Sequence, residues 1–171
     1  LGFNYSQSDD IILSYNRVSG KYYESEKFKL IIEREFVFLL NKNRNNYKIN
    51  FSINKVGTYN LYEKNIKFEI IDSSSFVLNK NRNVAQLDLN KLKFPLLIRN
   101  WENGDSFKPL GMKKNKKVSD FLIDKKAPNY IKIFQCVILS DNKIVWLIDH
   151  QIHDEFKVSN KTEKVLSISI N

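Results

Sequence analysis

The feature that most constrains the fold is a series of short segments in which apolar and polar residues alternate. Residues 47–54 (YKINFSIN) alternate strictly, and residues 164–170 alternate from Leu166 onwards. A period of two is the pattern of a β-strand with one buried face. Residues 136–139 and 143–148 are apolar and flank a Ser-Asp-Asn turn, which predicts an antiparallel hairpin. The chain is therefore expected to consist mainly of antiparallel strands.

Helical signals are fewer. Residues 117–126 place Val118, Phe121 and Leu122 at the spacing of one helical face. Near the N-terminus, Ser6 precedes two acidic residues and an apolar stretch, which predicts a helix with Ser6 as its N-cap. The fold class is therefore predicted as α+β, with mainly antiparallel strands, few helices and two small subdomains.

A hairpin is predicted at residues 28–39, with apolar arms on either side of a charged turn, and further strands at 67–71 and 84–89. The segment 90–95 ends in a proline and marks a plausible joint. We accordingly predict a linker and central β-rich subdomain over residues 1–93 and a C-terminal domain over residues 94–171.

Composition excludes several classes. Unbroken apolar runs reach five residues, against about 20 for a membrane-spanning helix, so no membrane association is expected. The single cysteine, Cys136, lies in an apolar stretch and is interpreted as a buried, inert thiol in a reducing, cytoplasmic compartment. The chain opens on Leu1 without an initiator methionine, and we interpret it as part of a longer protein.

The charge is concentrated in the middle of the chain. The net charge is +9, which favours a polyanionic partner. Residues 41–93 carry 10 basic and 4 acidic side chains, residues 94–135 carry 9 and 4, and both ends are nearly neutral. A lysine-rich and asparagine-rich composition, of the kind an AT-rich genome produces, raises the total charge without regard to function. The distribution is therefore more informative than the sum.

The segment 103–126 holds the strongest candidate for phosphate binding. Glycines and a proline shape a loop that leads into four lysines, which the sequence places at the start of the predicted helix. Lysine ammonium groups and the free N–H groups of a helix start both attract phosphate. Arg99 and Trp101 add planar groups that can stack on a base or ribose. The alternative is a solvated lysine loop. The predicted RNA-binding residues are Arg99, Lys113, Lys114, Lys116, Lys117, Lys125, Lys126 and Lys132.

Three other groups of polar residues invite functional interpretations. His150 and His153 have acidic neighbours, but their spacing does not converge on a metal, and we interpret both as surface polar residues. Asp120 and Asp124 lie one helical turn apart among lysines, which favours surface salt pairing over catalysis. Two asparagine-rich turns, carrying Lys42 and Arg44 and then Lys80 and Arg82, are either a second electrostatic contact or solvated loops.

The order of these motifs resembles one family. The run Leu97-Ile-Arg99, Gly104-Asp105-x-Phe107-x-Pro109-Leu-Gly111-Met112, Lys116-Lys117-Val-Ser-Asp120-Phe121 and Pro128 is similar to the C-terminal substrate-binding domain of tRNA(Ile)-lysidine synthetases. The later Ile144-Val-Trp146, Phe156-Lys157-Val158 and Thr162 continue the pattern. Residues 1–45 more loosely resemble the preceding segment in versions from the Bacteroidetes group. Departures occur at Ser106, Asp149, Gln151 and Glu155, so residues 149–155 are not assigned RNA contacts.

This resemblance implies a function for the parent protein. The family attaches lysine, with ATP, to the wobble cytidine of a tRNA(Ile) with a CAU anticodon. Its catalysis belongs to an N-terminal ATP-pyrophosphatase domain with a glycine-rich phosphate loop, whereas the five glycines here are isolated. The resemblance thus implies a tRNA-binding fragment with no catalytic, cofactor or metal residues of its own. Its expected partners are the tRNA and that N-terminal domain, with a homodimer as a further option.

Two alternatives stay open at the level of sequence. In the first alternative, the chain is a docking or dimerisation module without RNA contact, and its apolar surface comes from Phe36, Phe38, Trp101 and Trp146. A free-standing enzyme is the second alternative, but neither a nucleophile–base grouping nor a phosphate loop is recognisable in the sequence.

Overall fold

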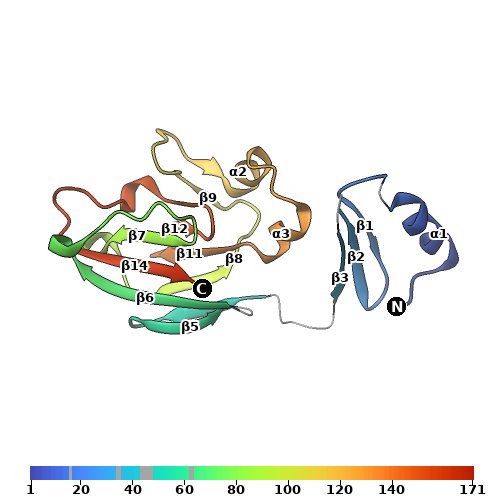
Figure 1. Ribbon diagram of the computed structural model, residues 1–171, viewed down its shortest axis with the longest axis horizontal. Helices are drawn as coiled ribbons and strands as arrows, with labels where there is room; N and C mark the ends of the chain where they lie inside the picture. The colour runs from blue at the N-terminus through green and yellow to red at the C-terminus, as the bar shows by residue number, and fades with distance from the viewer. Residues whose placement is uncertain (16, 34–35, 43–47, 62–63) are drawn as a thin grey trace. The chain divides into compact units, whose positions relative to one another are not determined.

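The computed structural model describes residues 1–15, 17–33, 36–42, 48–61 and 64–171 (Figure 1). The chain forms two compact units. The smaller unit comprises residues 1–47 and 126–134, and the larger comprises residues 48–125 and 135–171. Every strand pair in the described part of the chain is antiparallel, and helices are few, as the sequence predicts. None of the described helices combines the length and the apolar character needed to cross a membrane.

The smaller unit contains one helix before a three-stranded sheet of order β1-β2-β3. Its elements are α1 (Tyr5–Ser14), β1 (Lys21–Glu24), β2 (Phe28–Ile32) and β3 (Val37–Asn41), with α3 (Asn129–Phe134) from later in the chain. Strands β2 and β3 confirm the predicted hairpin. Its core is small, because Tyr23, Leu30 and Ile32 are the buried members of its apolar cluster.

The predicted helix cap at Ser6 is wrong by two residues. Asn4 is the N-cap, and its side-chain oxygen accepts a hydrogen bond from the Gln7 backbone N–H at 2.8 Å. The Gln7 side chain accepts one from the Asn4 N–H at 3.1 Å in return. This reciprocal pair satisfies two N–H groups that a helix start otherwise leaves unbonded.

The larger unit is built from two principal sheets. One has five strands in the order β13-β12-β11-β8-β4, and the other has four strands in the order β5-β6-β14-β7. The strands are β4 (Asn50–Ile53), β5 (Gly57–Leu61), β6 (Lys64–Asp72), β7 (Val84–Asp88), β8 (Leu96–Asn100), β11 (Cys136–Ser140), β12 (Lys143–Leu147), β13 (Gln151–Ile152) and β14 (Lys164–Ile170). The hairpin predicted across the Ser-Asp-Asn turn is confirmed as β11–β12.

Shorter elements complete this unit. A two-stranded ribbon joins β9 (Ser106–Phe107) to β10 (Lys116–Lys117), and α2 (Val118–Asp124) follows it directly. Single 3₁₀ turns occur at η2 (Ser73–Ser75), η3 (Leu89–Lys91) and η4 (Asp154–Phe156). The helix predicted for residues 117–126 is therefore real but shorter than expected.

Apolar side chains from both principal sheets pack into one core. Phe68, Leu87 and Leu166 come from the four-stranded sheet, while Ile98 and Trp146 come from the five-stranded sheet, and all five are at most 1% exposed. Burial of such side chains contributes about 1.5–3 kcal/mol each to the free energy of folding. Cys136 is also buried there as a free thiol, as the sequence predicts.

The boundary predicted near residue 93 does not coincide with the division into units, which falls at Lys48. Pairing across the predicted joint explains the difference. Strand β4 pairs with β8, and β14 lies between β6 and β7. Residues 48–93 therefore share a core with the C-terminal segment. Alternation within a strand reveals its buried face but says nothing about its partner.

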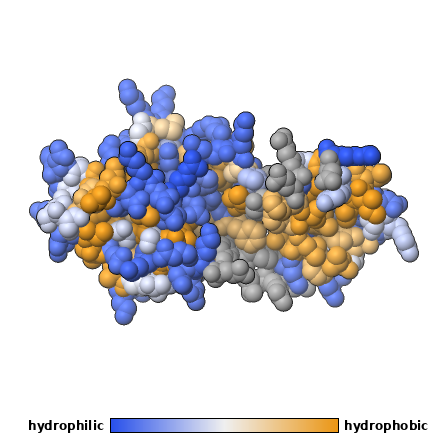
Figure 2. Space-filling view, in the orientation of Figure 1, coloured by the Kyte–Doolittle hydropathy of each residue, from blue (hydrophilic) through white to orange (hydrophobic). Residues whose placement is uncertain are grey.

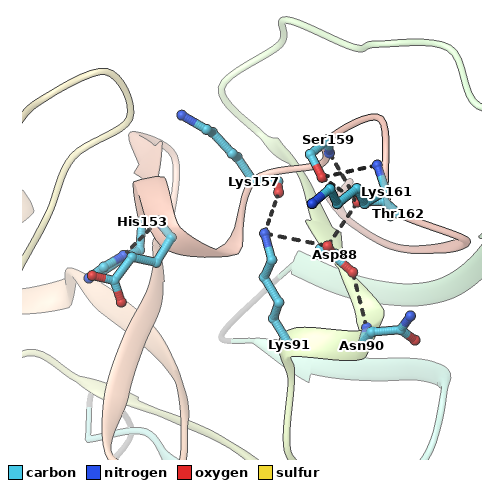
Figure 3. A network of polar contacts seen from close by, with 9 residues as sticks. Asp88, Asn90, Lys91, His153, Lys157, Ser159, Lys161 and Thr162 are labelled. Atoms are coloured by element: carbon cyan, nitrogen blue, oxygen red, sulfur yellow. Dashed lines mark hydrogen bonds and ion pairs between the residues drawn. The ribbon is translucent and has the colours of Figure 1, made fainter.

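A buried carboxylate links β7 to the turn before β14 (Figure 3). Asp88 is the last residue of β7 and is 4% exposed. It accepts hydrogen bonds from the Thr162 hydroxyl at 2.8 Å and from the Asn90 backbone N–H at 3.2 Å, and the Lys91 ammonium lies 3.4 Å away. Thr162 in turn accepts from the Ser159 N–H. Thr162 thus ties the turn before β14 to the end of β7.

We expect Thr162→Val to lower the free energy of unfolding by about 1–3 kcal/mol, because it keeps the shape of the side chain and removes the donor to a buried carboxylate. Urea denaturation monitored by circular dichroism measures the change. Asp72→Ala, at the exposed end of β6, is the control and should change stability by less than about 0.5 kcal/mol. Equal stability of Thr162→Val and the parent chain would show that this contact contributes nothing.

A candidate RNA-binding surface

The loop between β8 and α2 is organised around Asp105. Its carboxylate accepts two hydrogen bonds from the Arg99 guanidinium, at 2.7 and 2.8 Å, and one from the Glu102 backbone N–H at 2.8 Å. Its backbone carbonyl accepts from the N–H of Val118, the first residue of α2, at 2.9 Å. Asp105 therefore fixes the end of β8, the loop and the start of α2 to one another.

The same contacts define the position of Arg99. Its side chain is 15% exposed, and both terminal nitrogens face Asp105. The hydrogen bonds to Asp105 raise the pKa of Arg99, against the opposite effect of burial. Arg99 thus acts in this structure as an anchor of the loop. Its predicted contact with RNA stays a prediction.

A second set of bonds holds the far end of the loop. The Leu110 N–H donates to the Ile152 carbonyl at 3.1 Å, and the Asp154 N–H donates to the Lys108 carbonyl at 2.8 Å. Gly111 adopts a left-handed φ of 81° and donates its N–H to the Asp154 carboxylate at 2.9 Å. The hydrogen bond from the Gly111 N–H is the main cause that lowers the pKa of Asp154, and a hydrogen bond from the Lys157 ammonium lowers it further. Residues 152–154 therefore support the loop.

Sequence reasoning assigned no role to this support. The segment 149–155 was set aside because it departs from the family pattern at three positions. The available signal was the pair Gly111 and Asp154: a glycine that allows a left-handed turn, and a short acidic side chain able to cap an exposed N–H. Their separation of 43 residues hides the pairing in a single sequence.

The four lysines of the loop fall into two groups. Lys113 and Lys114 are exposed in the bend after Gly111. Lys116 and Lys117 instead form β10, where they pair in register with Phe107 and Ser106. The prediction that all four open the helix is therefore wrong, because α2 begins at Val118. Figure 2 shows hydrophilic side chains projecting at the top of the view, where Figure 1 draws this loop.

Lys116 differs from its neighbours in having a fixed partner. Its ammonium forms an ion pair with the Asp124 carboxylate at the end of α2. Asp124 therefore has the surface salt pairing that the sequence favours, with a lysine eight residues before it. Asp120 lies on the exposed side of α2, where its carboxylate accepts a hydrogen bond from the Ser119 hydroxyl.

Helix α2 buries the predicted face. Val118, Phe121 and Leu122 are at most 4% exposed, and the Phe121 ring packs edge-on against Phe107 with ring centroids 5.3 Å apart. Lys125 is the C-cap, and its ammonium lies 5.6 Å from the centroid of the Phe121 ring. The apolar face of this short helix thus packs against the larger unit and holds the adjoining lysine loop in place.

The remaining predicted lysines lie in the other unit. Lys126 and Lys132 belong to the smaller compact unit, whereas Arg99, Lys113, Lys114, Lys116, Lys117 and Lys125 belong to the larger one. Lys126 has a positive φ of 52° and Lys132 lies in the last turn of α3. The residues predicted as one basic surface are therefore divided between two units.

The two histidines have different surroundings. His153 is 6% exposed, its Nδ1 accepts the Glu155 N–H at 3.2 Å, and its ring packs against Phe156, so the surface interpretation is wrong for this residue. His150 is half-buried against Phe121. Burial lowers the pKa of both. No group of three potential metal ligands occurs among the residues that the structure describes.

The aromatic residues proposed for a docking module are placed differently. Trp146 is 1% exposed in the core and has almost no surface to offer a partner. Phe36 is 57% exposed, and Trp101 is half-buried. On the first asparagine-rich turn, Lys42 pairs with Glu24, and Arg44 lies outside the described residues. Lys80 and Arg82 are exposed on the second.

Comparison with known proteins gives a consistent result. Residues 1–44 match a family described as "TilS substrate binding domain", and residues 96–169 match "TilS substrate C-terminal domain". The tRNA(Ile)-lysidine synthase of Parabacteroides distasonis is 30% identical over 98% of this chain, and that of Bacteroides thetaiotaomicron is 29% identical over 99%. The chain spans 38% and 37% of the lengths of these relatives.

Solved structures agree on the fold. A crystal structure of a TilS C-terminal domain superimposes with a TM-score of 0.62 at 13% identity, covering 72% of this chain and 97% of that one. An N-terminal fragment of the phenylalanyl-tRNA synthetase β-subunit from Pyrococcus horikoshii gives a TM-score of 0.52, also at 13% identity, covering 99% and 63%. At these identities the likeness concerns the fold alone.

The Arg99–Asp105 pair yields a prediction with a defined pH dependence. Burial raises the pKa of Asp105, but the hydrogen bonds from Arg99 and the Glu102 N–H, with the charge of Arg99, outweigh it and leave the pKa below its ordinary value. A lowered folded-state pKa stabilises the fold above about pH 4, and this stability is lost as the pH falls through the folded-state pKa.

We expect Asp105→Asn to lower the free energy of unfolding at neutral pH by about 1.5–3 kcal/mol, because it removes a charged acceptor from Arg99. The difference from the parent chain should shrink below about pH 4. Urea denaturation over a pH series measures both. Asp124→Asn, in the exposed pair with Lys116, is the matched control and should cost less than about 1 kcal/mol. A difference independent of pH would contradict the assigned role of the charge.

Proposed function

The chain belongs to the tRNA(Ile)-lysidine synthase family, and we propose that it is the part of such an enzyme that holds the tRNA while another part carries out the chemistry. Within that proposal, the whole protein attaches lysine, with ATP, to the wobble cytidine of a tRNA(Ile) that has a CAU anticodon. ATP binds to the N-terminal ATP-pyrophosphatase domain of the same protein. The present chain contributes affinity and position.

The observation that carries the proposal is the way Lys113 and Lys114 are presented. Both are exposed, and they follow a loop that is fixed on one side through Asp105 and on the other through Asp154. Ammonium groups at such a position suit the regularly spaced phosphates of an RNA backbone, because phosphate contacts need charge and reach, not a base-specific donor pattern. A solvated loop would not need two independent anchors.

The other predicted residues contribute to different degrees. Lys117 is exposed beside the two lysines, whereas Lys116 must leave Asp124 or share its charge with it. Lys125 caps the far end of α2, and Lys126 and Lys132 act from the smaller unit. We therefore rank Lys113 and Lys114 first as phosphate contacts, with Lys117 next.

The double variant Lys113→Glu/Lys114→Glu is expected to lower the affinity for tRNA by about tenfold or more at about 50 mM salt. For this variant, the slope of log affinity against log salt concentration should be smaller in magnitude by about two, because two phosphate contacts are lost. Filter binding at about 50 and 200 mM salt measures both quantities.

Lys161→Glu/Lys164→Glu is the matched control, since it makes the same charge change at two exposed lysines just before and in β14. The control should shift the affinity by no more than about threefold through the change in net charge. Circular dichroism establishes that each variant is folded. Equal losses in the two double variants would mean that only net charge matters and would refute the assigned surface.

A second outcome concerns selectivity. We expect the chain to bind a tRNA with a CAU anticodon and an unrelated tRNA with affinities within about threefold of each other, because phosphate contacts position a nucleic acid without reading its sequence. Competition filter binding with the two tRNAs measures the ratio. A preference of about tenfold or more for the CAU tRNA would show that this chain itself contributes to recognition.

A further inference from the structure

The larger unit contains a cavity of about 450 Å³ that the surface described above does not use. It lies between the turn at residues 79–82, Leu110 of the lysine loop, the C-terminal end of α2 and the turn from β12 to β13. Pockets that hold small molecules generally measure about 300–1,000 Å³. The cavity is therefore of a size to enclose one nucleotide-sized group.

Its lining is partly apolar and partly basic. Leu110, Val84 and Ile152 line it, with smaller contributions from the nearly buried Phe121 and Trp146. Lys80, Arg82 and Lys125 bring positive charge to it, and among the described residues that line it none is acidic. Side-chain amides of Asn79, Asn81 and Gln151 add groups that both donate and accept hydrogen bonds.

His150 in the cavity lining lies close enough to Arg82 and Lys125 for their charges to influence its pKa. His150 lines the cavity and packs against Phe121 with ring centroids 5.7 Å apart. Burial has the largest effect on its pKa and lowers it. The charge of the neighbouring Asp149 raises the pKa, and the charges of Arg82 and Lys125 each lower it. The imidazole is consequently neutral near pH 7, with one nitrogen to donate a hydrogen bond and one to accept.

The basic turn is held in place by its own bonds. The Gln86 amide accepts from the Asn79 N–H at 2.8 Å and donates to the Val77 carbonyl at 3.0 Å. The Asn79 side-chain oxygen accepts from the Asn81 N–H at 2.9 Å, and the Val84 N–H donates to the Asn81 carbonyl at 3.1 Å. Gln86 lies in β7, so the turn that carries Lys80 and Arg82 is anchored to the sheet.

We propose that this cavity binds one unpaired nucleotide of an RNA strand, with the base against the apolar wall beside His150 and the phosphate at Lys80, Arg82 and Lys125. Proteins bind unpaired nucleotides by combining flat or apolar surfaces for the base with cations for the backbone, and by hydrogen-bonding the exposed base edge. A base in a duplex cannot enter, because its edge is paired and both faces are stacked. The inference rests on the proposed function in taking RNA as the partner.

The mixture of groups favours this occupant over a simple anion. An anion alone needs the cations but not a largely apolar cavity flanked by amides. An apolar ligand alone needs the apolar side chains of the lining but gains nothing from three cations, which have no acidic residue beside them in the lining. A nucleotide uses both parts, and its phosphodiester links connect the cavity to the backbone contacts of Lys113 and Lys114, since Leu110 belongs to the same loop.

The first test uses the two histidines of the chain as reporters in the folded protein. His150 lines the cavity, whereas His153 is buried and is not part of the lining, so it serves as the internal control. Imidazole carbon–proton resonances are recorded by NMR during titration with a single-stranded RNA of about six nucleotides. The His150 resonance should shift, and the His153 resonance should remain within the noise. A blunt RNA duplex should leave both unchanged.

The second test fills the cavity without changing its charge. Gln151→Phe adds bulk at the wall, and Leu110→Phe does so at the loop, so the proposal stays testable if one variant fails to fold. Each should weaken binding of the single strand by about tenfold, measured by fluorescence anisotropy, and leave duplex binding within about twofold, because stacked bases contribute much of single-strand affinity. Lys113→Glu/Lys114→Glu should weaken duplex binding more than either filled variant does.

Three results would overturn the proposal. Unchanged single-strand affinity in both filled variants would remove the cavity from binding. An equal shift of His150 on addition of inorganic polyphosphate would reduce the site to an anion site, and a shift with a phosphorylated peptide but not with RNA would assign it to protein. Loss of tRNA binding in Lys113→Glu/Lys114→Glu tests the proposed function separately, because that variant leaves the cavity intact.

Discussion

The ladder of hydrogen bonds on both sides of β14 is the constraint on which the larger unit depends. This strand lies between β6 and β7, with Leu166 opposite Ile70 on one side and Leu87 on the other. Without it, two strands from the middle of the chain would lose their common neighbour, and the apolar cluster would lose Leu166, Ile168 and Ile170. The four-stranded sheet is thus completed only when residues 164–170 have been synthesised, and such non-local pairing forms slowly.

Local patterns predicted the elements better than their arrangement. The alternation of residues 164–170 and the apolar face of residues 118–122 both gave the correct element, because they report on burial one strand or one helix at a time. The boundary near residue 93 differed from the observed units, since the partner of β4 lies more than 40 residues further along the chain. The cap at Ser6 failed for a more local reason: two side chains, Asn4 and Gln7, cooperate where the sequence suggested one.

The candidate surface shows the same division. The basic loop was recognisable from Lys113 and Lys114, but the contacts that hold it in place were not. The sequence suggests that Arg99 stacks on a base, whereas the structure shows its guanidinium bonded to Asp105. His153 was expected on the surface, yet Phe156 and the bend into η4 bury it. Residues 79–82 were identified only as a charged turn. Their position beside Phe121 and His150, which makes them part of a cavity, requires the tertiary structure.

The double anchoring of the lysine loop has a thermodynamic consequence. A basic loop that orders only on contact with RNA loses about 0.5–1.5 kcal/mol of free energy for each long side chain it immobilises, in addition to the backbone. Here the backbone on either side of Gly111 is already ordered by Asp105 and Asp154. Any binding at this loop would therefore restrict mainly the ends of the lysine side chains, and little free energy would be spent on ordering the backbone.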